Sequence, residues 1–488
     1  MATRVKPIAT ILAEGSDAEH GLKRSLGPWA LTAMGIGAII GTGIFVLTGV
    51  ASATRAGPAI TISFVVAGIT SAFAALCYAE VATKIPIAGS AYTYAYATFG
   101  ELLAWIIGWD LVLEYGLGAA TVSIGWSGYF VNLLQSLGIA VPQALVHSPF
   151  DVTPGIVNLP AAIIILIITA LLVRGTRESG LVNAVIVAIK LTIVLFFLVI
   201  GVGHVDPANY HLPPGTATGA GGYFPFGWNG VFGGAAFIFF AYIGFDAVST
   251  SAEEAQNPQR DLPFGILMSL AVCTVLYIAV VAILDGMVPF NQLNVASPVA
   301  FAMIHAGLPW AAFVISVGAI AGLTTVLLVM MFGQSRIMFA MSRDRLIPRG
   351  FTAIHPVWRT PVFSTVFFGI LIALAAAFTP IDVVGSLTNM GTLAAFVLVS
   401  IALPVLRARH PELRGGFTVP FGPYVIPALS AVTALALIFY LRFGSKEAWG
   451  IPLPWLGFVV WLAIGLAIYL GYGRRRSALA TTRSVLRA

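Results

Sequence analysis

Two glycine-containing turns interrupt hydrophobic segments that are otherwise suited to form helices. The first segment reads GIGAIIGTGIFVLTG and has Gly41, Thr42 and Gly43 near its middle. The second reads FGGAAFIFFAYIGFDAVST and contains Gly244 shortly before Asp246. A glycine inside a helix costs about 1 kcal/mol relative to alanine, and a carboxylate facing lipid is costly. We therefore predict that both segments unwind at these turns, with close packing of helices as the alternative explanation for the glycines.

An unwound turn in a helix could bind a zwitterion. It exposes N–H groups at the start of one half-helix and carbonyl groups at the end of the other, which suit a carboxylate and an ammonium respectively. We expect the N–H groups of Gly41, Thr42 and Gly43 to bind the carboxylate, with the Thr42 hydroxyl as a further donor. Tyr242 and Gly244 complete the second turn. The carbonyl groups expected to bind the ammonium belong to Ile39, Ile40, Phe240, Ala241 and Ile243.

Two ionisable residues are expected at the depth of these turns. Lys190 and Glu114 each lie about 14 to 18 Å from a membrane surface at 1.5 Å per helical residue. Burial disfavours the charged form of a lysine, so Lys190 could release and regain a proton. Glu114 is the second candidate for proton coupling, with a structural hydrogen bond as the alternative. Asp110, one turn from Glu114, is expected to make a structural hydrogen bond. The pair Glu80 and Lys84 is also expected to be structural.

The amino-acid composition indicates that these segments lie in a membrane. Of the 488 residues 59% are hydrophobic and 9% are charged, whereas about 25% are charged in soluble domains. Apolar runs of about 20 residues recur from Leu31 to Tyr472, and each is long enough to span a bilayer. We predict an all-α polytopic membrane protein with twelve transmembrane helices, centred near Ile39, Ile69, Leu113, Ile165, Val194, Phe239, Val275, Val326, Ile370, Ala394, Leu435 and Ile464.

The basic residues predict the orientation of the chain. Of the 25 Lys and Arg residues, all but Arg55, Lys190, Arg442 and Lys446 fall on the side of the N-terminus, which the positive-inside rule makes cytoplasmic. We expect the inner (plasma) membrane as the location, with both termini cytoplasmic. The charge of +6 is then an insertion signal rather than a nucleic-acid footprint.

The spacing of the two turns predicts an internal repeat. They fall in spans 1 and 6, which is the offset of a five-plus-five inverted repeat. The predicted parts are a cytoplasmic N-terminal segment (1–26), a first repeat of spans 1 to 5 (27–202), a second repeat of spans 6 to 10 (230–404), spans 11 and 12 (424–472) and a basic cytoplasmic tail (473–488).

A resemblance to a known family rests on three stretches of the chain. They are IGTGIFVLTG (40–49), GSAYTYAYATFGELLAWIIGWDLVLEY (89–115) and YIGFDAVSTSAEEAQNPQRDLPFGI (242–266). They closely resemble the cationic amino acid transporter branch of the amino acid, polyamine and organocation superfamily, and the resemblance runs from span 1 through span 10. It implies a LeuT-like fold in which spans 1 to 5 and 6 to 10 are inverted repeats and spans 11 and 12 are peripheral.

The same resemblance implies a function and roles for two residues. The chain is expected to be a secondary active transporter of L-amino acids that works by alternating access as a proton-coupled symporter. Lys190 resembles the lysine that stands in proton-coupled relatives where sodium-coupled ones bind sodium. Phe240 matches an aromatic residue that closes over the substrate as a gate.

Other classes of function are less well supported by the sequence. The seven histidines fall in loops or at span ends and no HExxH motif is present, so we expect no enzyme, metal or cofactor. The apolar spans do not suggest a channel. A sodium-coupled symporter, with Thr324 and Thr325 as ion ligands, and an amino acid exchanger remain open. The substrate is also open, between a cationic amino acid and a small neutral one.

Overall fold

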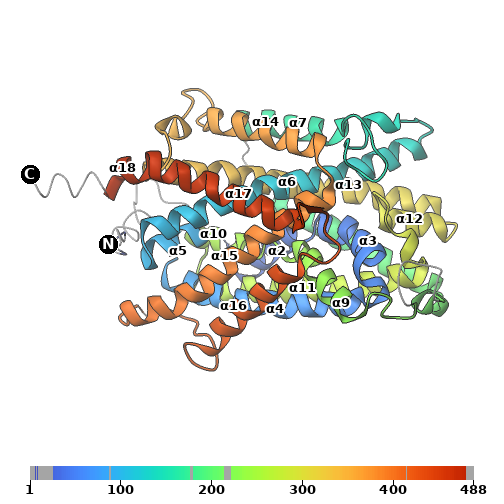
Figure 1. Cartoon of the computed structure of the whole chain (residues 1–488), viewed down its shortest axis with the longest axis horizontal. Helices are drawn as coiled ribbons and strands as arrows, with labels where there is room; N and C mark the ends of the chain where they lie inside the picture. The colour runs from blue at the N-terminus through green and yellow to red at the C-terminus, as the bar shows by residue number, and fades with distance from the viewer. Residues whose placement is uncertain are drawn as a thin grey trace, which may run out of the picture.

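The protein is a long bundle of helices. The computed structural model describes residues 6, 8, 26–86, 90–175, 180–213, 221–413 and 415–479. Most of the predicted N-terminal segment and the end of the predicted tail lie outside these residues. The long helices run side by side along the longest axis of the molecule, and loops join them at its two ends (Figure 1). Helices satisfy their own backbone hydrogen bonds, as lipid requires.

The first half of the chain begins with a helix that breaks and resumes. Helix α2 (Pro28–Ile39) is followed by a π-helix η1 (Gly43–Leu47), α3 (Thr48–Ala51), a second π-helix η2 (Ser52–Ala56) and a 3-10 turn η3 (Gly57–Ala59). The remaining elements of this half are α4 (Ile60–Lys84), α5 (Ser90–Thr98), α6 (Glu101–Ser136), η4 (Gln143–Leu145), α7 (Leu159–Arg174), α8 (Gly180–Gly201), η5 (Val202–His204) and η6 (Pro207–His211).

The second half begins in the same way. Helix α9 (Gly227–Ile238) passes into a 3-10 helix η7 (Phe239–Tyr242), and a helix resumes at α10 (Ala247–Thr250). The elements that follow are η8 (Ala252–Glu254), α11 (Pro258–Met287), η9 (Phe290–Gln292), α12 (Pro298–His305), α13 (Pro309–Arg343), η10 (Arg349–Thr352), α14 (Val362–Phe378), α15 (Ile381–Arg409), α16 (Val425–Tyr440), α17 (Leu453–Ile468), η11 (Tyr469–Gly473) and α18 (Arg474–Arg476).

The lengths of the helices confirm a polytopic membrane protein. Within the described residues, eight helical segments are long and apolar enough to cross a membrane. Four shorter apolar helices, α2, α7, α14 and α16, accompany them. Every predicted span centre lies in one of the observed helical elements, although the number of crossings stays a prediction. The eight segments are Gly43–Lys84, Glu101–Ser136, Ala184–His204, Gly227–Ser249, Pro258–Met287, Pro309–Arg343, Ile381–Arg409 and Leu453–Arg476.

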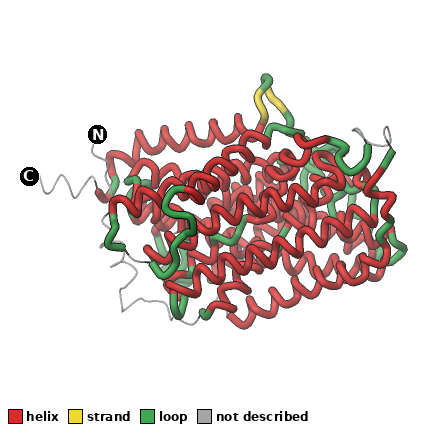
Figure 2. Tube along the Cα trace, turned by 90° about the horizontal axis from the view of Figure 1, so that it is seen from below, coloured by secondary structure: helices red, strands yellow, loops and turns green. Residues whose placement is uncertain are grey.

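One small element departs from the all-α prediction. Strands β1 (Glu447–Ala448) and β2 (Ile451–Pro452) pair antiparallel between α16 and α17. Their turn contains Trp449 and Gly450, both with positive φ. Figure 2 shows this hairpin projecting from the side of the bundle, part-way along its length. A two-residue turn joins strands too short to leave a periodic signal in the sequence.

The helices divide into an inner group and a lipid-facing group. Helix α6 packs along α13 and α15, α11 packs along α2 and α4, and η1 contacts η7. Large apolar side chains are exposed on the outer helices, where a bilayer would cover them. Examples, one each from α7, α8, α14, α16 and α17, are Ile163, Val199, Leu374, Val432 and Val459.

Asp344 contacts residues near both ends of the described chain. The Lys6 ammonium lies 3.2 Å from a carboxylate oxygen of Asp344, and the N–H of Ala478 donates to the carbonyl oxygen of Asp344 over 3.1 Å. The Tyr92 hydroxyl also donates to the Asp344 carboxylate over 2.7 Å. The start and the end of the described chain therefore lie at the same end of the bundle.

Candidate functional site

The first helix breaks at the start of the predicted turn, whereas Thr42 and Gly43, which were expected to be unwound, are already helical. Helix α2 ends at Ile39, and Ile40 is extended, with ψ 102°. The helix then resumes, and the N–H groups of Ile44 and Phe45 both donate to the carbonyl oxygen of Gly41, over 3.2 and 3.3 Å. The interruption therefore centres on Ile40 and Gly41.

The second break has a sharper turn. After η7 the chain is extended at Ile243, with ψ 135°, and Gly244 has φ 119°. L-amino acids that carry a side chain rarely adopt this φ, so glycine is required there. The helix resumes when the N–H of Ala247 donates to the Gly244 carbonyl oxygen over 3.1 Å.

The two breaks touch each other. A Cβ atom added to Gly43 would lie 2.5 Å from Ala241 Cβ, and one added to Gly244 would lie 2.8 Å from the carbonyl carbon of Ala38. Both distances are far below van der Waals contact. The predicted groups at 39–43 and 240–244 are thus brought together, and both explanations of the glycines apply: the helices break, and they also pack closely at Gly43.

Lys190 binds the end of the first half-helix. Its side chain is 1% exposed, and its Nζ donates to the carbonyl oxygens of Gly37 and Ile40 over 2.6 and 3.2 Å. The Tyr277 hydroxyl of α11 donates to the Ile39 carbonyl oxygen over 2.8 Å. In this conformation, the Ile39 and Ile40 carbonyls that we assigned to a substrate ammonium already accept hydrogen bonds from the protein. The Phe240 carbonyl oxygen accepts from the N–H of Ile243, over 3.2 Å.

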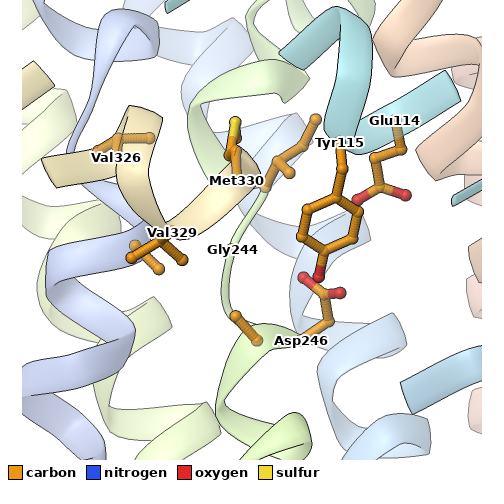
Figure 3. Close-up of a pocket in the computed structure, with 10 residues that line it drawn as sticks. Glu114, Tyr115, Gly244, Asp246, Val326, Val329 and Met330 are labelled. Atoms are coloured by element: carbon orange, nitrogen blue, oxygen red, sulfur yellow. The ribbon is translucent and has the colours of Figure 1, made fainter. Parts of the chain in front are cut away.

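A narrow pocket lies beside the two breaks (Figure 3). It has a volume of about 20 Å³, which is room for about one water molecule, so a larger ligand requires the surrounding helices to move apart. Aliphatic and thioether groups form one wall, and carboxylates stand opposite. The lining residues come from both breaks (Ala38, Ile243, Gly244, Asp246 and Ala247), from α6 (Glu114 and Tyr115) and from α13 (Val326, Val329 and Met330).

Two acidic side chains approach this pocket. Glu114 and Asp246 are both buried, at 3% exposure each, and Figure 3 shows the Tyr115 ring beside Glu114 with its hydroxyl directed toward the Asp246 carboxylate. The sequence singled out Asp246 as a charge that marks the break, yet we did not include it in the predicted binding site. Val326, Val329 and Met330 were also missed, because apolar residues in an apolar helix carry no distinguishing signal.

Other predicted site residues lie nearby in the core. Thr42 is fully buried, and its hydroxyl has no hydrogen-bond partner among the described residues. The Tyr242 hydroxyl donates to the Phe64 carbonyl oxygen over 2.8 Å, which gives this side chain a structural role. Phe240 is 4% exposed, and its role as a gate stays a prediction.

Glu80 and Asp110 are two further acidic residues, and they differ in their hydrogen bonding. Glu80 pairs with Lys84 over 3.2 Å, as expected, and also accepts a two-point hydrogen bond from Arg407 and one from the N–H of Val419. By contrast, neither carboxylate oxygen of Asp110 has a hydrogen-bond partner among the described residues. The structural hydrogen bond expected for Asp110 is therefore not observed.

The fold and this site define a class of protein. The chain is a multi-pass membrane protein with two discontinuous helices that meet at a small buried site, an arrangement typical of transporters. Within the part of the chain that the structure describes, there is no group of three or more His, Cys, Asp or Glu side chains able to hold a metal ion.

Comparison with known proteins identifies the family. The model of the amino acid permease family matches residues 26–469, so the chain belongs to this family, within the amino acid, polyamine and organocation superfamily. It is 48% identical over 479 residues to the branched-chain amino acid permease BcaP of Bacillus subtilis, and 47% identical over 476 residues to the methylthioribose transporter of the same organism. Each match covers 98% of both chains.

A more distant relative supports the resemblance found in the sequence. The vacuolar cationic amino acid transporter 4 of Arabidopsis thaliana is 38% identical over 413 residues, which is 84% of this chain and 67% of that protein. The family and the names of these relatives make the chain a transporter of amino acids or related small molecules rather than an enzyme.

Proposed function

We propose that the chain is a secondary active transporter of L-amino acids that works by alternating access in the plasma membrane, with both termini cytoplasmic. The observation that carries this proposal is the contact between the two broken helices, because it gathers backbone donors and acceptors at one buried site. We also propose a LeuT-like fold, with 27–202 and 230–404 as inverted repeats. The equivalent order of the two breaks in the chain supports the repeats.

The proposed substrate is an amino acid with an apolar side chain. The N–H groups at 41–43 would bind its carboxylate, and carbonyls of the second break would bind its ammonium, helped by the negative charge of Asp246 or Glu114. The side chain would lie against Val326 and Met330 of α13. The similarity to a branched-chain amino acid permease supports this choice, while the two acidic residues keep a cationic amino acid as the second candidate.

We further propose that protons drive the transport through Lys190. A protonated Lys190 would hold the Gly37 and Ile40 carbonyls, and its loss of a proton would weaken these hydrogen bonds and loosen the first half-helix. The two-point contact of Nζ supports this role. The sodium alternative has less support, because a charged Lys190, with its Nζ at the carbonyls of the first break, would repel a second cation there.

Uptake by the purified chain in proteoliposomes tests the proposed function. We expect saturable uptake of neutral, apolar L-amino acids, with competition among them, when the liposomes contain no amino acid. Uptake that requires amino acid inside the liposomes would make the chain an exchanger. Absence of uptake for the whole set of L-amino acids, with methylthioribose transported instead, would reject the proposal.

The proposed gate gives a separate prediction. Phe240 lies next to the extended residues of the second break, so Phe240→Ala should weaken substrate retention and lower the rate of uptake by about 10-fold or more, which is 1.4 kcal/mol. Phe237→Ala is the control for a general loss of packing, because Phe237 is 0% exposed, and it should lower the melting temperature at least as much while lowering the rate of uptake less. Normal uptake kinetics in Phe240→Ala would show that this ring only fills space.

A further inference from the structure

The second break has its own side-chain partner, on α15. Asn389 is 0% exposed, and its Nδ2 donates to the carbonyl oxygens of Ala236 and Phe237 over 3.0 and 2.6 Å. These carbonyls belong to the last turn of α9, where helical carbonyl groups lose their regular partners. An amide oxygen in the place of Nδ2 would repel both carbonyls, so the NH₂ group must face them. Both hydrogens of Asn389 are therefore used to complete the end of a broken helix.

The contact resembles that of Lys190 in both chemistry and position. Lys190 donates to two carbonyls at the end of α2, and Asn389 donates to two carbonyls at the end of α9. Lys190 lies on the helix that would end the first repeat, α8, and Asn389 on the helix that would end the second, α15. If the repeats of the proposed function are correct, the two residues occupy equivalent places.

We propose that Asn389 is the positioning residue of the second break, the neutral counterpart of Lys190. An unpaired carbonyl in a water-free interior is costly, by about 1 to 3 kcal/mol, so the two hydrogen bonds determine where α9 stops and η7 begins. The end of α9 sets the positions of Phe240, Ala241 and Ile243. A carboxamide does not titrate, so this half-helix stays held at every pH, whereas the half-helix that Lys190 holds can be released.

Hydrogen–deuterium exchange of the purified chain tests the proposal without any substrate. In Asn389→Leu, which removes both donors at similar volume, exchange in peptides covering 236–247 should rise about 10-fold, the effect of one or two lost hydrogen bonds. Ser400→Ala is the matched control on α15, because the Ser400 hydroxyl contacts the Phe396 carbonyl oxygen of its own helix and the Ser430 hydroxyl of α16, each over 2.7 Å, and not the end of α9. It should leave this segment unchanged. Unchanged exchange in Asn389→Leu as well would overturn the proposal.

Uptake kinetics distinguish a positioning role of Asn389 from a general loss of stability. Asn389→Leu should raise the KM for uptake by about 10-fold at every pH and leave the shape of the pH profile unchanged, whereas Lys190→Met should flatten that profile. A KM equal to that of the unmodified chain, or a flattened profile in Asn389→Leu, would contradict the assignment.

The test also covers a variant that fails to insert and a chain that transports no amino acid. If Asn389→Leu does not insert into membranes, Asn389→Ala replaces it, because alanine also removes both donors without the bulk of leucine. An effect of Asn389→Ala no larger than that of Ser400→Ala would overturn the proposal. If the unmodified chain transports no amino acid, the proposed function fails, while the exchange measurement still decides the role of Asn389.

Discussion

Replacing Lys190 with methionine is expected to abolish accumulation of substrate driven by a proton gradient. Methionine keeps an apolar stem of similar length but cannot bind or release a proton. The carbonyl oxygens of Gly37 and Ile40 would lose the Nζ donor that lies 2.6 and 3.2 Å away. Uptake with an inward proton gradient should therefore fall to the level measured without one, while binding of substrate survives, because its proposed contacts are backbone groups.

The control for this variant is a lysine outside the proposed site. Lys446 lies in the loop before β1, and its Nζ donates to the Phe150 carbonyl oxygen over 3.0 Å. Lys446→Met should keep proton-driven uptake. Accumulation against a gradient by Lys190→Met, with protons as the sole driving ion, would show that another group carries the proton, and Glu114 would then be the first candidate.

Adding one methyl group at Gly43 is expected to remove substrate binding. In Gly43→Ala the new Cβ would lie 2.5 Å from Ala241 Cβ and 2.8 Å from Ala241 N, so the two broken helices must move apart at their crossing. Overpacking of this kind costs about 1 to 3 kcal/mol, which corresponds to roughly a 5- to 150-fold loss of affinity. Thermal stabilisation of the purified variant by substrate measures this loss.

Gly41 provides a matched comparison within the same turn. A Cβ atom added there would lie 3.4 Å from Val326 Cγ2, an ordinary contact, so Gly41→Ala should bind substrate far better than Gly43→Ala. Gly41→Val, which is bulkier, should block access to the backbone and lose binding. Equal stabilisation of Gly43→Ala and the unmodified chain would show that the crossing of the two breaks does not shape the site.

The parts of the fold that the sequence predicts are those with unusual residues in an apolar setting. Glycines inside a span and a lysine with no route to water are costly, so Gly41, Gly244 and Lys190 reveal positions where the ordinary helix fails. The structure has its breaks at Gly41 and Gly244 and has Nζ of Lys190 bound to the first of them.

The remaining contacts have no comparable signal in the sequence. Tyr277 and Asn389 bind carbonyls at the two breaks, yet a tyrosine or an asparagine in a span is common, and its partner is distant in the chain. Val326 and Met330 line the pocket only because α13 packs beside both breaks. Asp110 was expected to be hydrogen-bonded from its residue type, and the packing of α6 against α15 leaves it without such a partner among the described residues.

The central claim is that the chain moves an amino acid across a membrane with protons as the driving ion. Its most direct test is the time course of uptake of a radiolabelled branched-chain amino acid into sodium-free proteoliposomes that hold only the unmodified chain and no internal amino acid. With an inward proton gradient, we predict that the internal concentration exceeds the external one and that a protonophore collapses the difference. Accumulation that needs sodium, or label that enters only in exchange for internal amino acid, would contradict the account.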